Sequence, residues 1–360
     1  MSKNKIFILG EAWGKDEEDA GGLPFVGASG KLLNAMLAQV GIDRKDCYVT
    51  NVFNLRPEPK NDVLNLCGPK TGGITGYPAL KAGKYIQARY APELDRLFRE
   101  IAAEEPNLII ALGASAAWAT LSTSGIKRVR GAPAALSGPA LTAVGKPIKV
   151  LPTYHPAAIL REWPLRAVTI MDLFKAAREA EYPEIRRPER FVYIEPSIDD
   201  LFAFERDFIL SASALSIDIE TAGDQITCVG FAPSIDRSIV VPFVDPMQKD
   251  GNYWRTAEEE VQAWAIVRRW CAMTIPPEKR RTRWKGLPYK PGVGQNFQYD
   301  MHRLWRTMGV EVVNEDDTML LHHSLQPELE KGLGFLATIY TDELPWKFMR
   351  AKHETLKKED

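Results

Sequence analysis

The chain has 360 residues, of which 45% are hydrophobic and 26% charged, and its formal net charge is −1. This length exceeds one ordinary hydrophobic core and fits two domains. The near-neutral charge excludes a globally basic nucleic-acid-binding protein, so any contact with nucleic acid must come from local patches. The four cysteines form no C-x-x-C pair, which fits a reducing cytosol and predicts neither disulfides nor a zinc site. The sequence has no long apolar run, and we expect neither export nor a membrane span.

The first half of the chain alternates short apolar runs with amphipathic stretches. This pattern predicts strands at 6–9, 48–52, 108–112 and 149–151, and helices at 29–40, 95–103, 114–121 and 167–180. Such alternation is typical of a mostly parallel sheet with helices on both faces, which is a three-layer α/β/α domain. The glycine- and proline-rich segment 67–83 is expected to be a long surface loop.

The charged run 181–190 contains two prolines and breaks this pattern, so we interpret it as an interdomain linker. It would separate a first domain at 1–180 from a second domain at 191–360. A new alternation begins at Phe191 and leads to a strand at 214–219. The fold class expected from the sequence is therefore α/β with two domains.

Polar residues follow three predicted strand ends in the first half, where catalytic groups of open α/β sheets gather. They form G-E-A-W-G at 10–14 with P-F-V-G at 24–27, then T-N-V at 50–52, then T-Y-H-P at 153–156. In order and spacing these motifs resemble the uracil-DNA glycosylase superfamily, most closely its family 4 branch. The resemblance covers about residues 5–178. It is particularly close to the glycosylase domain fused to some bacteriophage family A DNA polymerases.

The resemblance implies a role for three of these residues in base excision. An enzyme that removes a base must flip it out of the duplex and read it in a pocket. Phe25 matches the ring that stacks on the extruded base, and Asn51 matches the amide that reads the edge of uracil. His155 matches the histidine that stabilises the negative charge on the departing base.

A carboxylate is also needed to orient water and to offset the positive charge that develops on the sugar. By position the candidates are Glu11 and Glu17, and the sequence does not choose between them. Ile159, Leu160 and Arg161 follow the histidine where such enzymes push a wedge into the DNA stack.

The chain departs from the family 4 pattern in two ways. Trp13 stands where the family usually has proline. Family 4 members also hold an iron–sulfur cluster on four cysteines, and Cys47 and Cys67 do not reproduce that spacing. We therefore expect no iron–sulfur cluster and no other cofactor in this domain.

A second constellation of acidic residues lies in the second half. Asp218 and Glu220 stand at i and i+2 of a predicted strand, which directs both carboxylates to one face. Two acids on one face are a natural ligand pair for a hard metal ion. They are followed by G-Q-N-F-Q-Y-D at 294–300 and D-D-T at 316–318.

These motifs resemble the 3′–5′ proofreading exonuclease domain of family A DNA polymerases, over about residues 212–345. The resemblance implies an RNase H-like domain with a mixed sheet. It also implies two Mg²⁺ or Mn²⁺ ions held by Asp218, Glu220 and Asp300, with Asn296 at the DNA 3′ end. The segment L-G-F-L-A at 333–337 resembles the helix that follows.

The family completes this site with a third motif, Y-x-x-x-D, which this chain lacks. Tyr340 is followed at i+4 by Leu344, and the tail 352–360 has no such motif. We therefore expect an exonuclease domain that is truncated before its third motif. Three explanations stay open: the chain is cut from a longer polypeptide, a separate chain supplies the missing helix, or the nuclease is inactive.

A basic segment at 279–285 lies between the two acidic motifs. Arg281, Arg283 and Trp284 combine cations with an aromatic ring, which suits a single DNA strand. A solvated loop explains the same composition equally well.

The sequence thus predicts a DNA-processing enzyme of bacteriophage replication or repair, in the cytoplasm of the infected host. It would join uracil excision to an incomplete exonuclease, with DNA as its substrate and a polymerase domain as a partner, in cis or as a separate chain. One alternative is a non-catalytic module that binds or tethers DNA for a replicative polymerase. Another is a glycosylase that acts on a different base.

Overall fold

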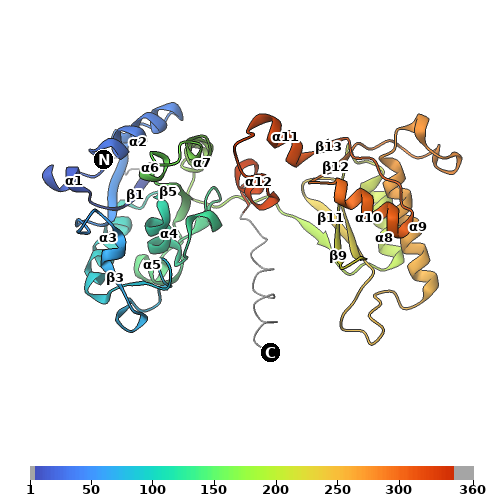
Figure 1. Ribbon diagram of the computed structural model, residues 1–360, viewed down its shortest axis with the longest axis horizontal. Coiled ribbons are helices and arrows are strands. Elements are labelled where there is room, and N and C mark those ends of the chain that lie inside the picture. The colour runs from blue at the N-terminus through green and yellow to red at the C-terminus, as the bar shows by residue number, and fades with distance from the viewer. Residues whose placement is uncertain (1–4, 344–360) are drawn as a thin grey trace. The chain divides into compact units, whose positions relative to one another are not determined.

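The computed structural model describes residues 5–343, and its chain divides into two compact units (Figure 1). Of the described residues, the first unit comprises 5–187 together with 332–343, and the second comprises Pro188–Lys331. The sequence had suggested that everything after residue 190 belongs to the second domain. The structure instead groups the segment after Lys331 with the first unit.

The first unit is built on a five-stranded sheet in the order β2-β1-β5-β7-β6. Its strands are β1 (Ile6–Ala12), β2 (Cys47–Phe53), β5 (Leu108–Leu112), β6 (Ala134–Ala135) and β7 (Lys149–Thr153). All neighbouring strands are parallel except β6, which runs antiparallel to β7. A parallel sheet needs both faces covered, and β5 and β7 are accordingly buried along their whole length.

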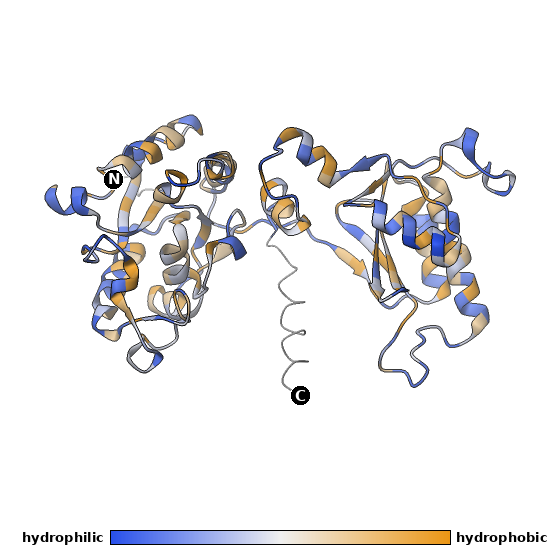
Figure 2. Cartoon of the chain, viewed as in Figure 1, coloured by the Kyte–Doolittle hydropathy of each residue, from blue (hydrophilic) through white to orange (hydrophobic). Residues whose placement is uncertain are grey.

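Helices cover both faces of this sheet, since the strands send alternate side chains to opposite sides. One apolar cluster joins the sheet to α3 (Ala91–Glu104), α4 (Gly113–Leu121) and α5 (Gly138–Val144). The other joins it to α2 (Ala28–Gln39), α6 (Pro156–Ile159) and α7 (Leu165–Glu179). The expected three layers are therefore present in this unit. Helix α1 (Lys15–Asp19) buries no residue and is hydrophilic in Figure 2.

The segment 67–83, expected to be a surface loop, is partly built into the first unit. It begins with β3 (Cys67–Gly68), which pairs antiparallel with β4 (Tyr85–Ile86). Tyr77 and Leu80 are buried in the same apolar cluster as α3. The glycines and prolines hid this packing because they interrupt any regular hydrophobic period.

Two segments that flank the second unit in sequence are attached to the first unit. The Lys149 ammonium donates to the carbonyl of Glu184 at 2.8 Å, and Arg187 donates to the carbonyl of Pro133 at 3.0 Å. Helix α12 (Leu333–Tyr340) buries Leu336 through Ile339. Most of the expected linker 181–190 is thus held on the first unit by hydrogen bonds.

The second unit contains a six-stranded sheet in the order β13-β12-β9-β10-β11-β8. The strands are β8 (Phe191–Tyr193), β9 (Leu215–Ala222), β10 (Gln225–Ala232), β11 (Arg237–Pro242), β12 (Gly292–Gly294) and β13 (Asp316–Asp317). Strand β10 is antiparallel to both neighbours and the other pairs are parallel, so the sheet is mixed, as expected.

The helices of the second unit are α8 (Ile198–Phe204), α9 (Ala257–Met273), α10 (Gln298–Met308) and α11 (Thr318–Leu325). A π-helical turn, Glu205–Ile209, follows α8. The core lies among the sheet, α8, α9 and Leu304 of α10, around the fully buried indole of Trp270. Within residues 5–343, no helix has the length and apolar composition needed to cross a membrane.

Candidate active site

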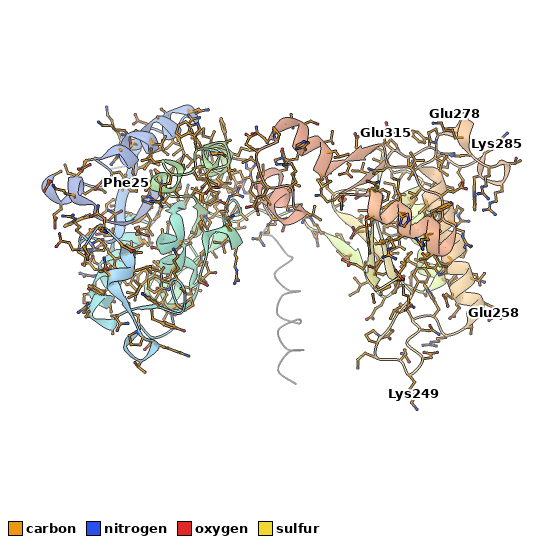
Figure 3. The ribbon with its side chains drawn as sticks, in the orientation of Figure 1. Phe25, Lys249, Glu258, Glu278, Lys285 and Glu315 are labelled. Atoms are coloured by element: carbon orange, nitrogen blue, oxygen red, sulfur yellow. The ribbon has the colours of Figure 1, made fainter. Side chains whose placement is uncertain are left out.

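The three motifs of the first unit meet at one edge of its sheet. Glu11 lies near the end of β1, Asn51 near the end of the adjacent β2, and His155 two residues after β7. Phe25 comes from the loop between α1 and α2 and is labelled in Figure 3. Because the carboxyl ends of parallel strands share an edge, residues far apart in sequence become neighbours there.

Gly10 provides the space in which two of these side chains meet. A methyl group on Gly10 would collide with Asn51 Oδ1 and would lie 2.7 Å from Phe25 Cζ. The Phe25 ring also stacks on the His155 ring, with a centroid distance of 5.6 Å and an interplanar angle of 29°. The structure therefore brings Phe25, Asn51 and His155 together. Sequence reasoning did not select Gly10, although its place directly before Glu11 was a usable signal.

The backbone of Phe25 is held in an uncommon conformation. Its φ is +57°, which is unfavourable for a bulky residue unless the surroundings fix it. Arg44 donates to the carbonyls of Phe25 and Pro24 at 3.1 and 2.6 Å. Gly30 lets helix α2 approach this turn so closely that any Cβ there would collide with the Phe25 carbonyl. The position of the aromatic ring is thus fixed by its own backbone.

The imidazole of His155 has a defined tautomer. Its Nδ1 accepts a hydrogen bond from the backbone N–H of Ala157 at 3.2 Å, so the ring proton resides on Nε2. Burial lowers the pKa of His155 to about 4, and the charge of Arg161 contributes in the same direction. Near pH 7 the ring is therefore neutral and can donate one hydrogen bond from Nε2.

The side-chain amide of Asn51 is held in place and stays available for hydrogen bonds to a ligand. The residue is 3% exposed, and its backbone carbonyl accepts from Arg96 at 2.8 Å. None of the hydrogen bonds found among the described residues uses the Asn51 side chain. An amide held in this way offers one acceptor and two donors to a ligand.

The structure distinguishes the two candidate carboxylates. Glu11 accepts a hydrogen bond from the Ser115 hydroxyl at 2.5 Å. Burial raises the pKa of Glu11, and the Ser115 hydrogen bond opposes this rise. The charge of Arg161 lowers the pKa of Glu11, as it lowers that of His155. Glu17 instead accepts from the backbone N–H of Gly14 at 3.0 Å and caps helix α1. Glu11 shares the surroundings of His155, whereas Glu17 has a role in its own helix.

The segment expected to form a DNA wedge divides into a buried and an exposed part. Ile159 is 0% exposed and belongs to the core under α2 and α7, so the expectation that it enters DNA is wrong. Leu160 is 50% exposed, and Arg161 is exposed as well. Trp163, which sequence reasoning missed, is 60% exposed, with the Arg166 guanidinium 5.6 Å from its ring.

Trp13 packs on a glycine. Its backbone N–H donates to the carbonyl of Leu55 at 3.2 Å, and its ring lies where a methyl group on Gly22 would be 2.7 Å away. Gly22 has a φ of +88°, which a side chain rarely adopts. The indole of Trp13 is therefore accommodated by the turn at Gly22.

The acidic residues of the second unit are neighbours. Asp218 is exposed and Glu220 is half-buried, on the face of β9 opposite to its buried isoleucines, as their spacing predicts. The Asp300 carboxylate accepts from the backbone N–H of Ile219 at 2.9 Å. Burial raises the pKa of Asp300 to about 6, and the charges of Asp218 and Glu220 add to the rise.

These carboxylates do not form a complete metal site. Among residues 5–343, no group of three or more His, Cys, Asp or Glu side chains is arranged to hold a metal ion. One oxygen of Asp300 is already used by Ile219. The residues examined for the third motif, Leu344 and 352–360, lie outside the described part of the chain. Within the described residues these carboxylates are not arranged as three ligands of one ion, and the expected pair of divalent ions stays a prediction.

Asn296 lies on a turn shaped by a neighbouring carboxylate. Its φ is +54°, and its side chain is exposed. The Asp317 carboxylate accepts from the N–H groups of Asn296 and Phe297 at 3.0 and 2.9 Å. Asp317 thus holds the turn that precedes α10.

The basic segment of the second unit is partly structural. Arg280 is buried and donates to the carbonyls of Ile275 and Met273, and such bonds stabilise the loop. Arg281 pairs with Glu311, whereas the Arg283 guanidinium lies 4.9 Å from the Trp284 ring. Lys285, labelled in Figure 3, is exposed at the same end of the unit. Both explanations of this segment remain compatible with its geometry.

The sheet edge of the first unit thus carries an aromatic ring and an amide that meet at Gly10, with a neutral imidazole stacked on the aromatic ring. A family model described as the uracil DNA glycosylase superfamily matches residues 2–178. A type-4 uracil-DNA glycosylase from Archaeoglobus fulgidus is 36% identical over 173 residues, covering 46% of this chain and 71% of that protein. The chain belongs to the uracil-DNA glycosylase superfamily through this region.

Further type-4 relatives agree with this assignment. The protein from Saccharolobus solfataricus is 30% identical over 202 residues, covering 53% of this chain and 78% of that protein. The protein from Thermotoga maritima is 33% identical over 176 residues, covering 48% and 76%. A solved structure, the Nibbler EXO domain of Aedes aegypti, covers 44% of this chain and 72% of that one at 14% identity. The TM-score of this match is 0.30.

Proposed function

We propose that the first unit removes uracil from DNA by hydrolysing the N-glycosidic bond. The observation that carries this proposal is the convergence of three side chains: Phe25 and Asn51 meet at Gly10, and the His155 ring stacks on the Phe25 ring. The relatives of this region that are named uracil-DNA glycosylases support it.

The pocket reads the base by shape and by hydrogen bonds. A uracil flipped out of the DNA stacks on the Phe25 ring, and its polar edge meets the Asn51 amide. Uracil presents an N–H donor beside a carbonyl acceptor, and the amide supplies the complementary acceptor and donor. The missing Cβ of Gly10 leaves the room in which ring and amide approach each other.

The chemical step breaks the bond between the sugar C1′ and the base N1, and the bonding electrons leave with the base. The Nε2–H of His155 donates to the base O2 and stabilises the resulting anion. A neutral imidazole suits this role because near pH 7 it keeps the proton on Nε2 and can donate it in a hydrogen bond. Ionised Glu11 orients a water molecule and accepts its proton as the water oxygen bonds to C1′. The immediate products are an abasic sugar and the uracil anion. The anion takes up a proton from water to become free uracil, and Glu11 returns the proton it accepted to the solvent.

We also propose that this domain works without an iron–sulfur cluster. The support is the set of two cysteines in the first unit, Cys47 and Cys67, where four ligands would be needed. Analysis of the purified chain for iron and acid-labile sulfide tests this directly. Stoichiometric amounts of both would overturn the proposal.

The test of the proposed activity uses oligonucleotides that each carry one uracil, thymine or modified pyrimidine. We expect free uracil from single- and double-stranded substrates, and loss of release in Asn51→Ala and His155→Ala variants. Release of another base in preference to uracil would support a glycosylase of different specificity. No release of any base would support a module that binds DNA without catalysis.

For the second unit we propose contact with single-stranded DNA during replication or repair. The support is the pairing of Arg283 with Trp284 beside exposed Lys285, together with the sequence motifs at 218–220 and 296–300. In this proposal the chain acts beside a family A polymerase, in cis or as a separate chain, in a phage-infected cell. A gel-shift titration with single-stranded DNA, comparing wild type with Trp284→Ala, tests the contact, and equal affinities would overturn it.

A further inference from the structure

A buried polar network behind strand β7 includes helix α12, which follows the second unit in sequence. The Thr338 hydroxyl accepts a hydrogen bond from Arg130 Nη1 at 2.8 Å. Arg130 is 1% exposed and makes two further bonds to the Asp172 carboxylate, at 3.1 and 2.6 Å. A buried guanidinium needs such partners because water cannot replace them.

A second set of bonds attaches the same helix. The buried Lys175 ammonium donates to the carbonyls of Gly131, Thr338 and Thr341 at 2.9, 2.6 and 2.5 Å. The contact is close, because a methyl group on Gly131 would lie 2.6 Å from the Thr338 carbonyl oxygen and 2.7 Å from Asp172 Oδ1. Helix α12 is therefore an integral part of the first unit.

The other end of the network reaches the candidate active site. Asp172 Oδ2 accepts from the Thr153 hydroxyl at 2.7 Å, and Thr153 is the last residue of β7, two positions before His155. The Arg130 guanidinium also lies 5.8 Å from the Tyr154 ring and 5.4 Å from the Phe335 ring of α12. A continuous series of contacts thus joins α12 to the two residues that precede His155.

We propose that Thr338 is a positioning residue for base excision, which sets the orientation of the His155 ring through Arg130, Asp172 and Thr153. The inference rests on the proposed function, in which His155 stabilises the departing base. Without the Thr338 acceptor, Arg130 must turn toward another partner and release part of its hold on Asp172. Thr153 then loses its fixed partner, and the hydrogen bond from His155 Nε2 to the base is misdirected.

The kinetic test compares two matched substitutions in the full chain. Thr338→Val removes the hydroxyl that Arg130 contacts, whereas Thr341→Val removes a hydroxyl that, among the described residues, bonds Ala337 and Glu343. We expect Thr338→Val to lower kcat for uracil release about threefold to tenfold, with KM changed by less than about twofold. Thr338→Ser should restore kcat, and Thr341→Val should match wild type.

A spectroscopic readout separates positioning from loss of fold and from failure of the proposed function. We expect the ¹⁵N signals of the His155 ring, assigned by comparison with His155→Ala, to shift in Thr338→Val but not in Thr341→Val. Unchanged His155 signals in folded Thr338→Val would overturn the proposal, even if kcat fell. A wild-type chain that releases no uracil would refute the proposed function, while the His155 signals would still decide the role of Thr338.

Discussion

Arg161 influences both groups that carry the proposed chemistry. Its charge lowers the pKa of His155 and also opposes the rise in the pKa of Glu11. Burial is the largest cause of both pKa shifts, and the Arg161 charge adds to it at His155 and opposes it at Glu11. The cation thus favours a neutral imidazole and an ionised carboxylate, which are the forms that base excision needs. This effect of the Arg161 charge on two pKa values adds to the contact with DNA that the sequence predicts for Arg161.

Matched substitutions of the two glutamates test which carboxylate orients the water. Glu11→Gln should lower kcat for uracil release about 100-fold, because the amide cannot accept the proton of the attacking water. Glu17→Gln should keep kcat near wild type and cost at most about 1 kcal/mol of unfolding free energy, because Glu17 caps α1. Single-turnover rates and urea unfolding measure both. A larger kcat loss in Glu17→Gln would reverse the assignment.

The pH dependence of release should follow Glu11 on the acid side. His155 must be neutral and is so above its pKa of about 4, whereas Glu11 must be ionised and burial raises its pKa above 4.5. Activity should therefore rise with pH through the pKa of Glu11. The residual activity of Glu11→Gln should lack this limb. A pH–rate profile of both proteins checks this, and an identical acid limb in the two would contradict it.

At the scale of elements, α6 ends on a buried residue, Ile159, and is followed by an exposed one, Leu160. Ile159→Ala should destabilise the first unit by about 2–4 kcal/mol, because it removes fully buried methyl groups. Leu160→Ala should leave stability unchanged and reduce uracil release from duplex DNA more than from single strands, because a wedge acts only on a stack. Thermal unfolding and paired release assays separate the two effects. Equal losses on both DNA forms would argue against a wedge.

The alternation of strands and helices allowed most of the first unit to be predicted, because buried parallel strands read as short apolar runs. Strand β6 was not predicted, because two residues are too few to show a hydrophobic period. The hairpin of β3 and β4 was not predicted for the same reason. The partner of α12 was mispredicted for a different reason. An apolar helix face shows that a helix packs, but not on which domain. The contacts of Arg130 and Lys175 with Thr338 show that α12 packs on the first unit.

Residues of the candidate site could be predicted where the chemistry requires a particular residue type. They could be predicted less well where hydrogen-bond partners and burial decide the role of a residue. Phe25, Asn51 and His155 were identified from their motifs, and they converge. The choice between the two glutamates required the Ser115 and Gly14 hydrogen bonds, which spacing does not encode. Ile159 was misjudged because an exposed and a buried isoleucine look identical in a short helix.

For the whole molecule, the second unit should not act as an efficient nuclease. With Mg²⁺ or Mn²⁺ and a labelled strand, we expect weak or no shortening from the 3′ end, because the third motif, Y-x-x-x-D, is not found in this sequence. Asp218→Ala is the control for any residual activity. Rapid degradation that Asp218→Ala abolishes would mean that a ligand outside the described residues completes the site.

The measurement that tests uracil excision most directly is the single-turnover rate of free uracil release by the full chain. The substrate is an oligonucleotide with one uracil, and the comparison proteins are Asn51→Ala and His155→Ala. We expect measurable release by wild type and a loss of about 100-fold or more in each variant, the scale of losing one preorganised hydrogen bond to a developing anion. Release by wild type no faster than by these variants would contradict the proposed role of the pocket.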